Sequence, residues 1–309
     1  MIAYWSFVGK IERIDAFTEN CFVRVINPTQ EEIDYLVSQF KIPEDIIIDI
    51  LDPNERSRME IENDQVYFIQ RIPVQNQVNG IPYMTIPQGI IHTSNALVSI
   101  CSRENEIFYE VTNSARNRRL NLDSKVNLML ALFLYTTYTY HKYLKIINNQ
   151  TSDFERDIER STRNEELHRL LKMEKCLVYF TTSLKANELL YLKLQNSKFL
   201  KENTFNEDLL EDVLVENKQA IEMAGIYSDI LSGMMDAFAS IISNNLNIVM
   251  KQLTIVTIML MIPTLITSIF GMNVPNFMEE NPYAIFGILA SSILLAITGV
   301  LIFRRRKWL

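Results

Sequence analysis

The chain has 309 residues, 48% of them hydrophobic, which suits one large or two ordinary folded domains and excludes a disordered protein. Thirty Lys and Arg stand against 37 Asp and Glu, so no basic surface of the size that nucleic-acid binding needs is available. Residues 1–250 carry 35 acids and 25 bases, whereas the last 59 residues carry two acids and five bases. The three cysteines are far apart in sequence, which predicts neither a disulfide framework nor a zinc site.

The N-terminal part is predicted to be an α/β domain over residues 1–119, because six of the nine prolines fall between residues 28 and 87. Thr29 and Glu32 form a capping-box pattern that predicts a helix ending near Phe40. β-Branched and aromatic runs predict a strand over 19–27, a hairpin over 59–74 that turns at Asn63 and Asp64, and a strand pair over 86–93 and 96–102.

The rest of the chain is predicted to be helical, because no Gly or Pro occurs from Ile90 to Ala224. Two long helices over 121–160 and 163–200 give a hairpin that fills a 120–205 domain. A third helix, over 206–270, is predicted to start at a capping box of Thr204 and Glu207. Apolar residues with interspersed Asn and Ser recur along it every three or four positions, which favours packing against another helix. A helix of that length measures about 96 Å and must leave the domain.

Two segments near the C-terminus are long and apolar enough to cross a membrane. Residues 253–270 contain eighteen positions without a charge, and residues 283–303 contain twenty-one. A buried core helix is the alternative for the first segment, but the second segment so close behind it disfavours that interpretation. The loop 271–282 lacks Lys and Arg while the tail 304–309 is basic, so both termini are expected in the cytoplasm, with the first 250 residues.

The first predicted span carries a stripe of polar and thioether side chains on one face, which we call the pore stripe. Its members recur at steps of three and four: Asn247, Met250, Leu253 (or its neighbour Thr254), Thr257, Met261, Thr264 and Ser268. The stripe is typical either of a helix–helix contact that uses hydroxyl groups or of a face that lines a pore. One helix cannot enclose water, so a pore requires a homo-oligomer. The sequence shows no catalytic motif, and we predict no enzyme.

The residues that follow this span carry a signature. Phe270 is followed by Gly271, Met272 and Asn273, and Gly271 is expected to end the helix in a left-handed cap. A G-M-N triplet after a very long helix, between two terminal spans and before a basic tail, closely resembles the CorA family of divalent-metal channels, in its G-M-N branch. The resemblance covers the whole chain. Two positions depart from it: Phe270 replaces the usual Tyr, and Pro263 lies one residue nearer the signature than in the best-known bacterial members.

The resemblance implies an α+β cytosolic domain followed by long helices, two C-terminal transmembrane helices and a funnel-shaped homo-pentamer. It implies that Gly271, Met272 and Asn273 select the ion, with a ring of Asn273 carbonyls holding hydrated Mg²⁺. Met250 and Leu253 match a hydrophobic constriction, and Asn247 matches a polar ring below it.

The resemblance also implies regulation by acidic residues. Asp49 and Asp212 match carboxylates that bind regulatory Mg²⁺ between neighbouring subunits. Glu279 and Glu280 in the external loop would raise the local cation concentration without binding the ion directly.

The implied function is uptake of Mg²⁺, and also of Co²⁺ and Ni²⁺, through a membrane channel gated by cytosolic Mg²⁺. Mg²⁺ is expected as the transported and regulatory ion, with no further cofactor, and the expected partners are the lipid bilayer and other copies of the chain. Two alternatives stay open: a Zn²⁺ transporter of the ZntB branch, which shares the fold and a G-x-N signature, and a non-conducting membrane scaffold or sensor.

Overall fold

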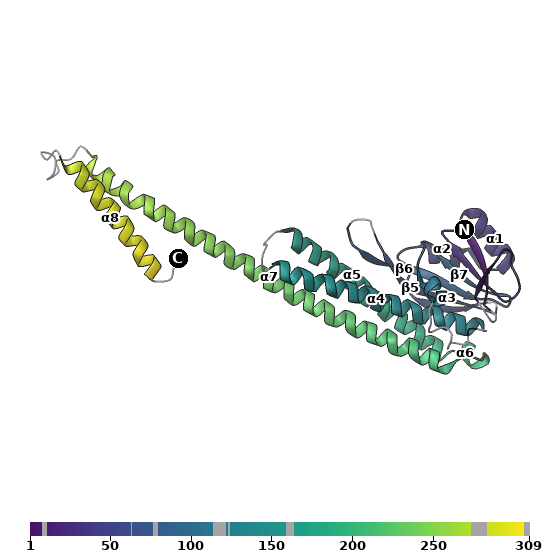
Figure 1. Ribbon diagram of the computed structural model, residues 1–309. Coiled ribbons are helices and arrows are strands. Elements are labelled where there is room, and N and C mark those ends of the chain that lie inside the picture. The colour runs from purple at the N-terminus through teal and green to yellow at the C-terminus, as the bar shows by residue number, and fades with distance from the viewer. Residues whose placement is uncertain are drawn as a thin grey trace. The chain divides into compact units, whose positions relative to one another are not determined.

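The computed structural model describes residues 1–7, 11–62, 64–76, 80–113, 122, 124–158, 164–272 and 283–305. The chain divides into two compact units, Met1–Met235 and Asp236–Leu309. One helix, α7 (Glu207–Phe270), contributes residues to both units (Figure 1).

A seven-stranded sheet forms the centre of the first unit, in the order β2-β1-β3-β7-β6-β5-β4. The strands are β1 (Ile2–Ser6), β2 (Glu12–Ile14), β3 (Cys21–Ile26), β4 (Arg58–Glu62), β5 (Gln65–Gln75), β6 (Tyr83–His92) and β7 (Ala96–Cys101). Strands β3 and β7 pair in parallel, and the other neighbours are antiparallel. The predicted β4–β5 hairpin and β6–β7 pair are confirmed, whereas the short strands β1 and β2 were not predicted from the sequence.

Helices cover both faces of the sheet, so the side chains of a strand alternate between two apolar cores. Phe22 and Leu97 belong to the core beneath α3 (Ile107–Asn113) and α4 (Lys125–Ile158). Their neighbours Val23 and Val98 belong to the core beneath α1 (Gln30–Phe40) and α2 (Glu44–Leu51). The predicted capping box of α1 is confirmed, because Thr29 and Glu32 each bond the other's backbone N–H. Burial on both faces holds the sheet as a fixed platform.

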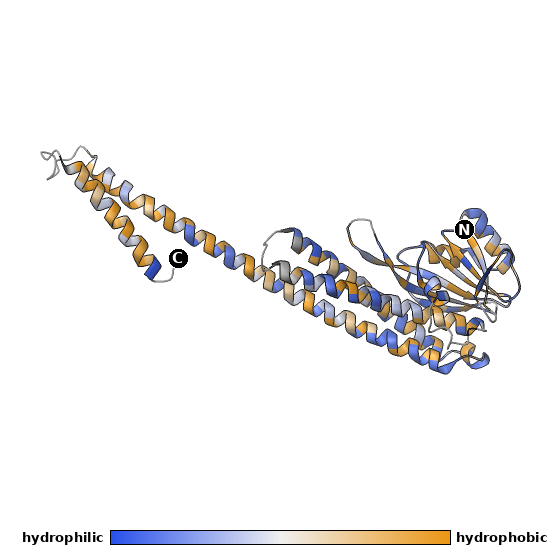
Figure 2. Cartoon of the chain, viewed as in Figure 1, coloured by the Kyte–Doolittle hydropathy of each residue, from blue (hydrophilic) through white to orange (hydrophobic). Residues whose placement is uncertain are grey.

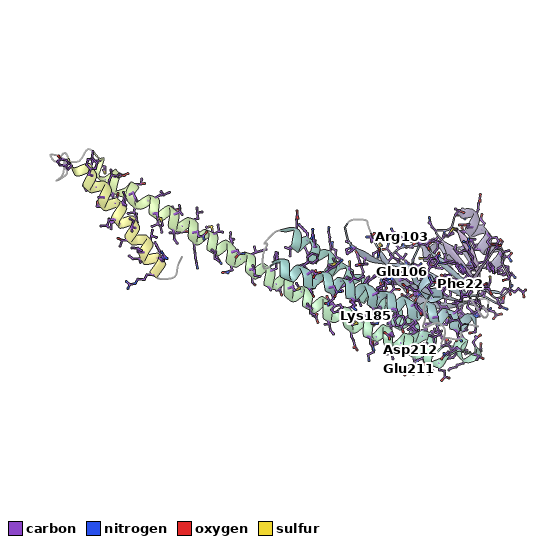
Figure 3. The ribbon with its side chains drawn as sticks, viewed as in Figure 1. Phe22, Arg103, Glu106, Lys185, Glu211 and Asp212 are labelled. Carbon is purple, nitrogen blue, oxygen red and sulfur yellow. The ribbon has the colours of Figure 1, made fainter. Side chains whose placement is uncertain are left out.

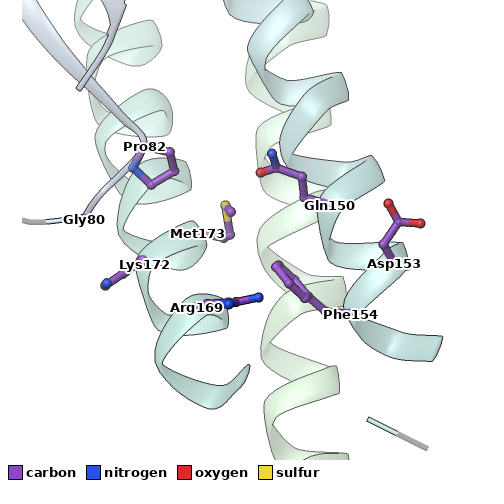
Figure 4. Close-up of a pocket in the computed structure, with 8 residues that line it drawn as sticks. All are labelled: Gly80, Pro82, Gln150, Asp153, Phe154, Arg169, Lys172 and Met173. Carbon is purple, nitrogen blue, oxygen red and sulfur yellow. The ribbon is translucent and has the colours of Figure 1, made fainter. Parts of the chain in front are cut away.

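The predicted helical hairpin consists of α4 and α5 (Asn164–Gln195). It ends earlier than predicted: the Ser197 hydroxyl accepts the N–H of Leu200 at 3.3 Å and starts a separate helix, α6 (Lys198–Glu202). A pocket of about 460 Å³ lies between α4 and α5, where the Arg169 guanidinium stands 5.8 Å above the centre of the Phe154 ring (Figure 4). This cation is therefore already engaged by an aromatic face.

The N-cap of helix α7 lies two residues later than predicted. Asn206, not Thr204, precedes its first residue and accepts the N–H of Leu209 at 3.4 Å. Within the first unit, a heptad of buried positions faces the hairpin: Leu210, Asn217, Ala224 and Leu231. Asn217 donates to the Leu184 carbonyl at 3.2 Å, so the polar member of this heptad also contacts α5.

The second unit contains the rest of α7 and helix α8 (Ala284–Arg305). Among the described residues, these two helices are long and apolar enough to cross a membrane. Figure 2 shows hydrophobic residues along both of them.

Candidate functional site

The pore stripe is exposed in the single chain, as are other positions of this span such as Leu260 and Leu265. Leu253 and Met261 are 58% and 66% exposed, whereas Ile255 on another face is 5% exposed. Ile262 contacts α8, since a Cβ atom added at Gly299 would lie 3.8 Å from its Cδ1 atom. At 3.6 residues per turn, the stripe from Met250 to Ser268 spans an arc of about 80°, and the covered isoleucines centre roughly 140° away from it. Helix α8 therefore packs on one side of α7, and the stripe from Leu253 to Ser268 faces away from it, whereas Asn247 and Met250 line a pocket with Phe303 of α8.

The hydroxyl groups of this span are held by the helix backbone. Thr254, Thr257 and Thr264 donate to the carbonyls four residues earlier, at 2.8, 2.8 and 2.7 Å. Each hydroxyl proton is thereby used inside the helix, which removes an unpaired donor from an apolar environment. The oxygen lone pairs of Thr257 and Thr264 remain as acceptors on the exposed stripe.

The signature begins where α7 ends. The N–H of Gly271 donates to the Thr267 carbonyl at 2.9 Å. The expected left-handed cap is wrong, since among the described glycines only Gly80 has a positive φ. A steric reason for glycine is present instead: a Cβ atom at Gly271 would approach the Thr267 oxygen to 3.2 Å. Gly271 and Met272 are exposed, while Asn273, Glu279 and Glu280 lie outside the described residues.

The two spans have their basic ends together. Lys251 precedes the apolar part of α7, and Arg304 and Arg305 end α8. Lys251 and Phe303 line one pocket of about 440 Å³, together with the stripe residues Asn247 and Met250. The described basic residues thus flank the same end of the helix pair.

The predicted regulatory residue Asp49 lies on α2 and is bound by an arginine of its own chain. Its Oδ2 atom lies 2.7 Å from the Arg58 guanidinium, which also contacts Glu60 at 2.6 Å and Glu55. Burial would lower the pKa of Arg58, but the hydrogen bonds to Glu60 and Asp49 outweigh it and raise that pKa. Arg58 was not among the residues predicted from the sequence. The signal was present, since Arg58 stands between Glu55 and Glu60 at the start of β4.

Asp212, the other predicted regulatory residue, is exposed on α7 next to Glu211 (Figure 3). Its neighbour Val213 is buried in the core with Leu209, which turns Asp212 toward solvent. Among the described residues of a single chain, no three His, Cys, Asp or Glu side chains converge into a group that could hold a metal ion. A shared site for Asp49 and Asp212 stays a prediction that requires a second subunit.

Comparison with known proteins gives one consistent result. A family model described as "CorA-like Mg2+ transporter protein" matches residues 18–305. The cobalt/magnesium transport protein CorA of Methanocaldococcus jannaschii is 27% identical over 288 residues, covering 92% of this chain and 89% of the relative. The complete structure of the CorA magnesium transporter from that organism aligns with a TM-score of 0.84 at 24% identity, over 100% of this chain and 99% of that one. The ZntB cytoplasmic domain from Vibrio parahaemolyticus aligns less well, with a TM-score of 0.58 at 14% identity over 79% of this chain and 96% of that one.

Proposed function

The chain belongs to the CorA-like Mg²⁺ transporter family, and we propose that it forms a channel that carries Mg²⁺ across the cell membrane, with Co²⁺ and Ni²⁺ as further cargo. The relative from Methanocaldococcus jannaschii is named a cobalt/magnesium transport protein, which supports both ions as cargo. The membrane potential supplies the driving force, at about 2.3 kcal/mol per elementary charge per 100 mV.

The observation that carries this proposal is the exposed pore stripe. Aligned hydroxyl oxygens on a membrane helix suit either a helix–helix contact or a pore, and in a pore they supply the acceptors that the water protons of a hydrated cation need. Thr257 and Thr264 hold their protons in the helix and offer lone pairs on that stripe. Because a single helix cannot enclose water, we propose a homo-oligomer, and a pentamer by family, with the stripe of each copy facing the central axis.

The proposed orientation places the first unit in the cytosol. Lys251 and the Arg304–Arg305 pair flank one end of the two spans, and the positive-inside rule assigns such an end to the cytoplasmic side. The loop with Asn273, Glu279 and Glu280 then faces outward, where the Asn273 ring would hold Mg²⁺ through its hydration water.

The proposed gate lies at the inner end of the stripe. Met250 and Leu253 are exposed in one chain and would form a narrow apolar ring in the oligomer, which stops ions by excluding water. Regulatory Mg²⁺ shared by Asp49 and Asp212 of neighbouring subunits would favour the closed state. The shift of the equilibrium between the open and closed states is set by the difference in Mg²⁺ affinity between those two states.

The test is metal flux into proteoliposomes that contain the purified protein, with Mg²⁺, Co²⁺, Ni²⁺ and Zn²⁺ compared in the presence and absence of a pH gradient. Asn273→Ala is expected to abolish Mg²⁺ flux while the oligomer stays assembled. Asn245→Ala, which removes an exposed α7 amide that is not part of the pore stripe, is the matched control and is expected to conduct.

Three results would contradict the proposal. Normal Mg²⁺ flux through an assembled Asn273→Ala oligomer removes the selectivity role of Asn273. Flux of Zn²⁺ without Mg²⁺, dependent on the pH gradient, would favour the ZntB alternative. The absence of any divalent flux through an intact oligomer would leave a scaffold or sensor.

A further inference from the structure

A cavity of about 680 Å³ lies in the first unit, beside the start of β4. Strand β4 pairs with β5 only from the Arg58–Ile69 pair onward, so Arg71 of β5 lies beyond the part of β5 that pairs with β4, although it still pairs with Pro87 of β6. The segment 54–57 and helix α5 form the walls of the cavity at this gap. Its volume falls within the range of roughly 300–1,000 Å³ that small-molecule sites occupy.

Arg71 is held rigidly at the floor of this cavity. The buried Asn187 of α5 accepts the N–H of Arg71 at 2.9 Å and donates to its carbonyl at 2.8 Å. The Arg71 guanidinium donates to the carbonyls of Glu55 and Thr85, at 2.5 and 2.7 Å. These acceptors are neutral, and among the described residues no carboxylate forms an ion pair with Arg71. Burial lowers the pKa of Arg71, and it outweighs Tyr140 and the carboxylates of Glu55 and Asp52, which act in the opposite direction.

The cavity carries an excess of positive charge. Arg56 and Lys185 also line it, both are exposed, and neither forms an ion pair with a described residue. The one lining carboxylate, Glu55, already contacts Arg58. The cavity is therefore lined by three cations and by one carboxylate that already forms an ion pair. This local positive charge contrasts with the net charge of −7 of the whole chain. This excess of positive charge favours an anionic ligand.

The opposite wall is apolar. Val178, Tyr179 and Leu189 of α5 line the cavity and are 53%, 43% and 69% exposed. A free phosphate would use only the cationic side, so the apolar wall indicates a ligand with an additional aromatic or apolar part. A guanidinium group donates two parallel hydrogen bonds to two oxygens of one phosphate. A Tyr ring is a surface on which a nucleobase stacks.

We propose that this cavity binds a nucleoside polyphosphate, with its phosphates on Arg56, Arg71 and Lys185 and its base against Tyr179. The site is distinct from the ion pathway. It depends on the proposed function in one respect only, the orientation that places the first unit in the cytosol, where nucleotides occur.

The experiment is calorimetric titration of the purified full-length oligomer with ATP, in EDTA so that metal binding elsewhere does not contribute. Saturable binding of one ATP per chain is expected. Lys185→Glu is expected to weaken ATP binding about tenfold or more, as for a lost hydrogen bond to a charged group. Lys175→Glu, which makes the same charge change at an exposed α5 position outside the cavity, is the control and is expected to change affinity by less than about twofold.

A second comparison distinguishes the contribution of the cationic wall to binding from that of the apolar wall. Tyr179→Ala is expected to weaken ATP binding while leaving the binding of inorganic tripolyphosphate unchanged. The absence of saturable ATP binding by the folded wild-type oligomer, or an equal loss in Lys185→Glu and Lys175→Glu, would overturn the proposal. A third result would also overturn it: the wild type does not bind ATP, and Lys185→Glu dissociates the oligomer. That combination would show that a second copy of the chain covers the cavity. Flux measurements are independent: a channel that conducts but does not bind ATP refutes this inference and not the proposed function.

Discussion

Arg58 is expected to compete with Mg²⁺ for Asp49, and Arg58→Gln tests this. The guanidinium lies 2.7 Å from the Asp49 carboxylate, so a metal ion must displace it or share the carboxylate with it. A unit charge at about 4 Å contributes about 1 kcal/mol in water and about 4 kcal/mol near a protein surface. Because the Asp49 side chain is 44% exposed, solvent screening reduces the effect to about 1 kcal/mol. Arg58→Gln is therefore expected to lower, about fivefold, the Mg²⁺ concentration that gives half-maximal protection from protease.

The assay is Mg²⁺-dependent protection of the full-length oligomer from a protease that does not cleave at arginine. Arg56→Gln is the matched control, because it removes the same charge from the same segment and has no ion pair with a described residue. Equal Mg²⁺ midpoints in the two variants would refute competition by Arg58. A higher midpoint in Arg58→Gln would show instead that Arg58 holds Asp49 in position for the metal.

Three further predictions concern the gate, the sensor and the fold. Leu253→Ser should wet the constriction and raise Mg²⁺ flux at high internal Mg²⁺, and unchanged or lower flux in an assembled variant would place the gate elsewhere. Asp49→Asn with Asp212→Asn should abolish Mg²⁺-dependent protease protection and weaken closure by internal Mg²⁺, and wild-type concentration dependence would exclude this pair as the sensor. Asn187→Ala should destabilise the first unit by about 2–4 kcal/mol, because it leaves the Arg71 N–H and the Ser57 hydroxyl without their acceptor, whereas the Arg71 carbonyl keeps the Tyr140 hydroxyl as a donor. Its melting temperature should fall by roughly 5–15 °C, whereas the exposed Asn196→Ala should melt like the wild type.

Elements with local signals were predictable from the sequence. Charge-free runs of eighteen and twenty-one residues identify the two apolar helices. Side-chain periodicity located the β4–β5 hairpin, the β6–β7 pair and the long helices, and the Thr29 capping box placed the start of α1. These signals work because hydrogen bonding within a helix and pairing within a hairpin connect residues that are close in sequence.

Only the tertiary structure decided which distant residues meet. Arg58 reaches Asp49 because the start of β4 packs beside α2, and Arg71 meets Asn187, 116 residues away, because α5 crosses the end of the sheet. Periodicity defined the pore stripe, but the packing of α8 on another face of α7 determined that the stripe stays uncovered. Gly271 was expected for a left-handed backbone, but its φ is not positive, and the nearby Thr267 carbonyl would instead crowd a side chain there. Such contacts depend on how whole elements pack, and no local pattern encodes that packing.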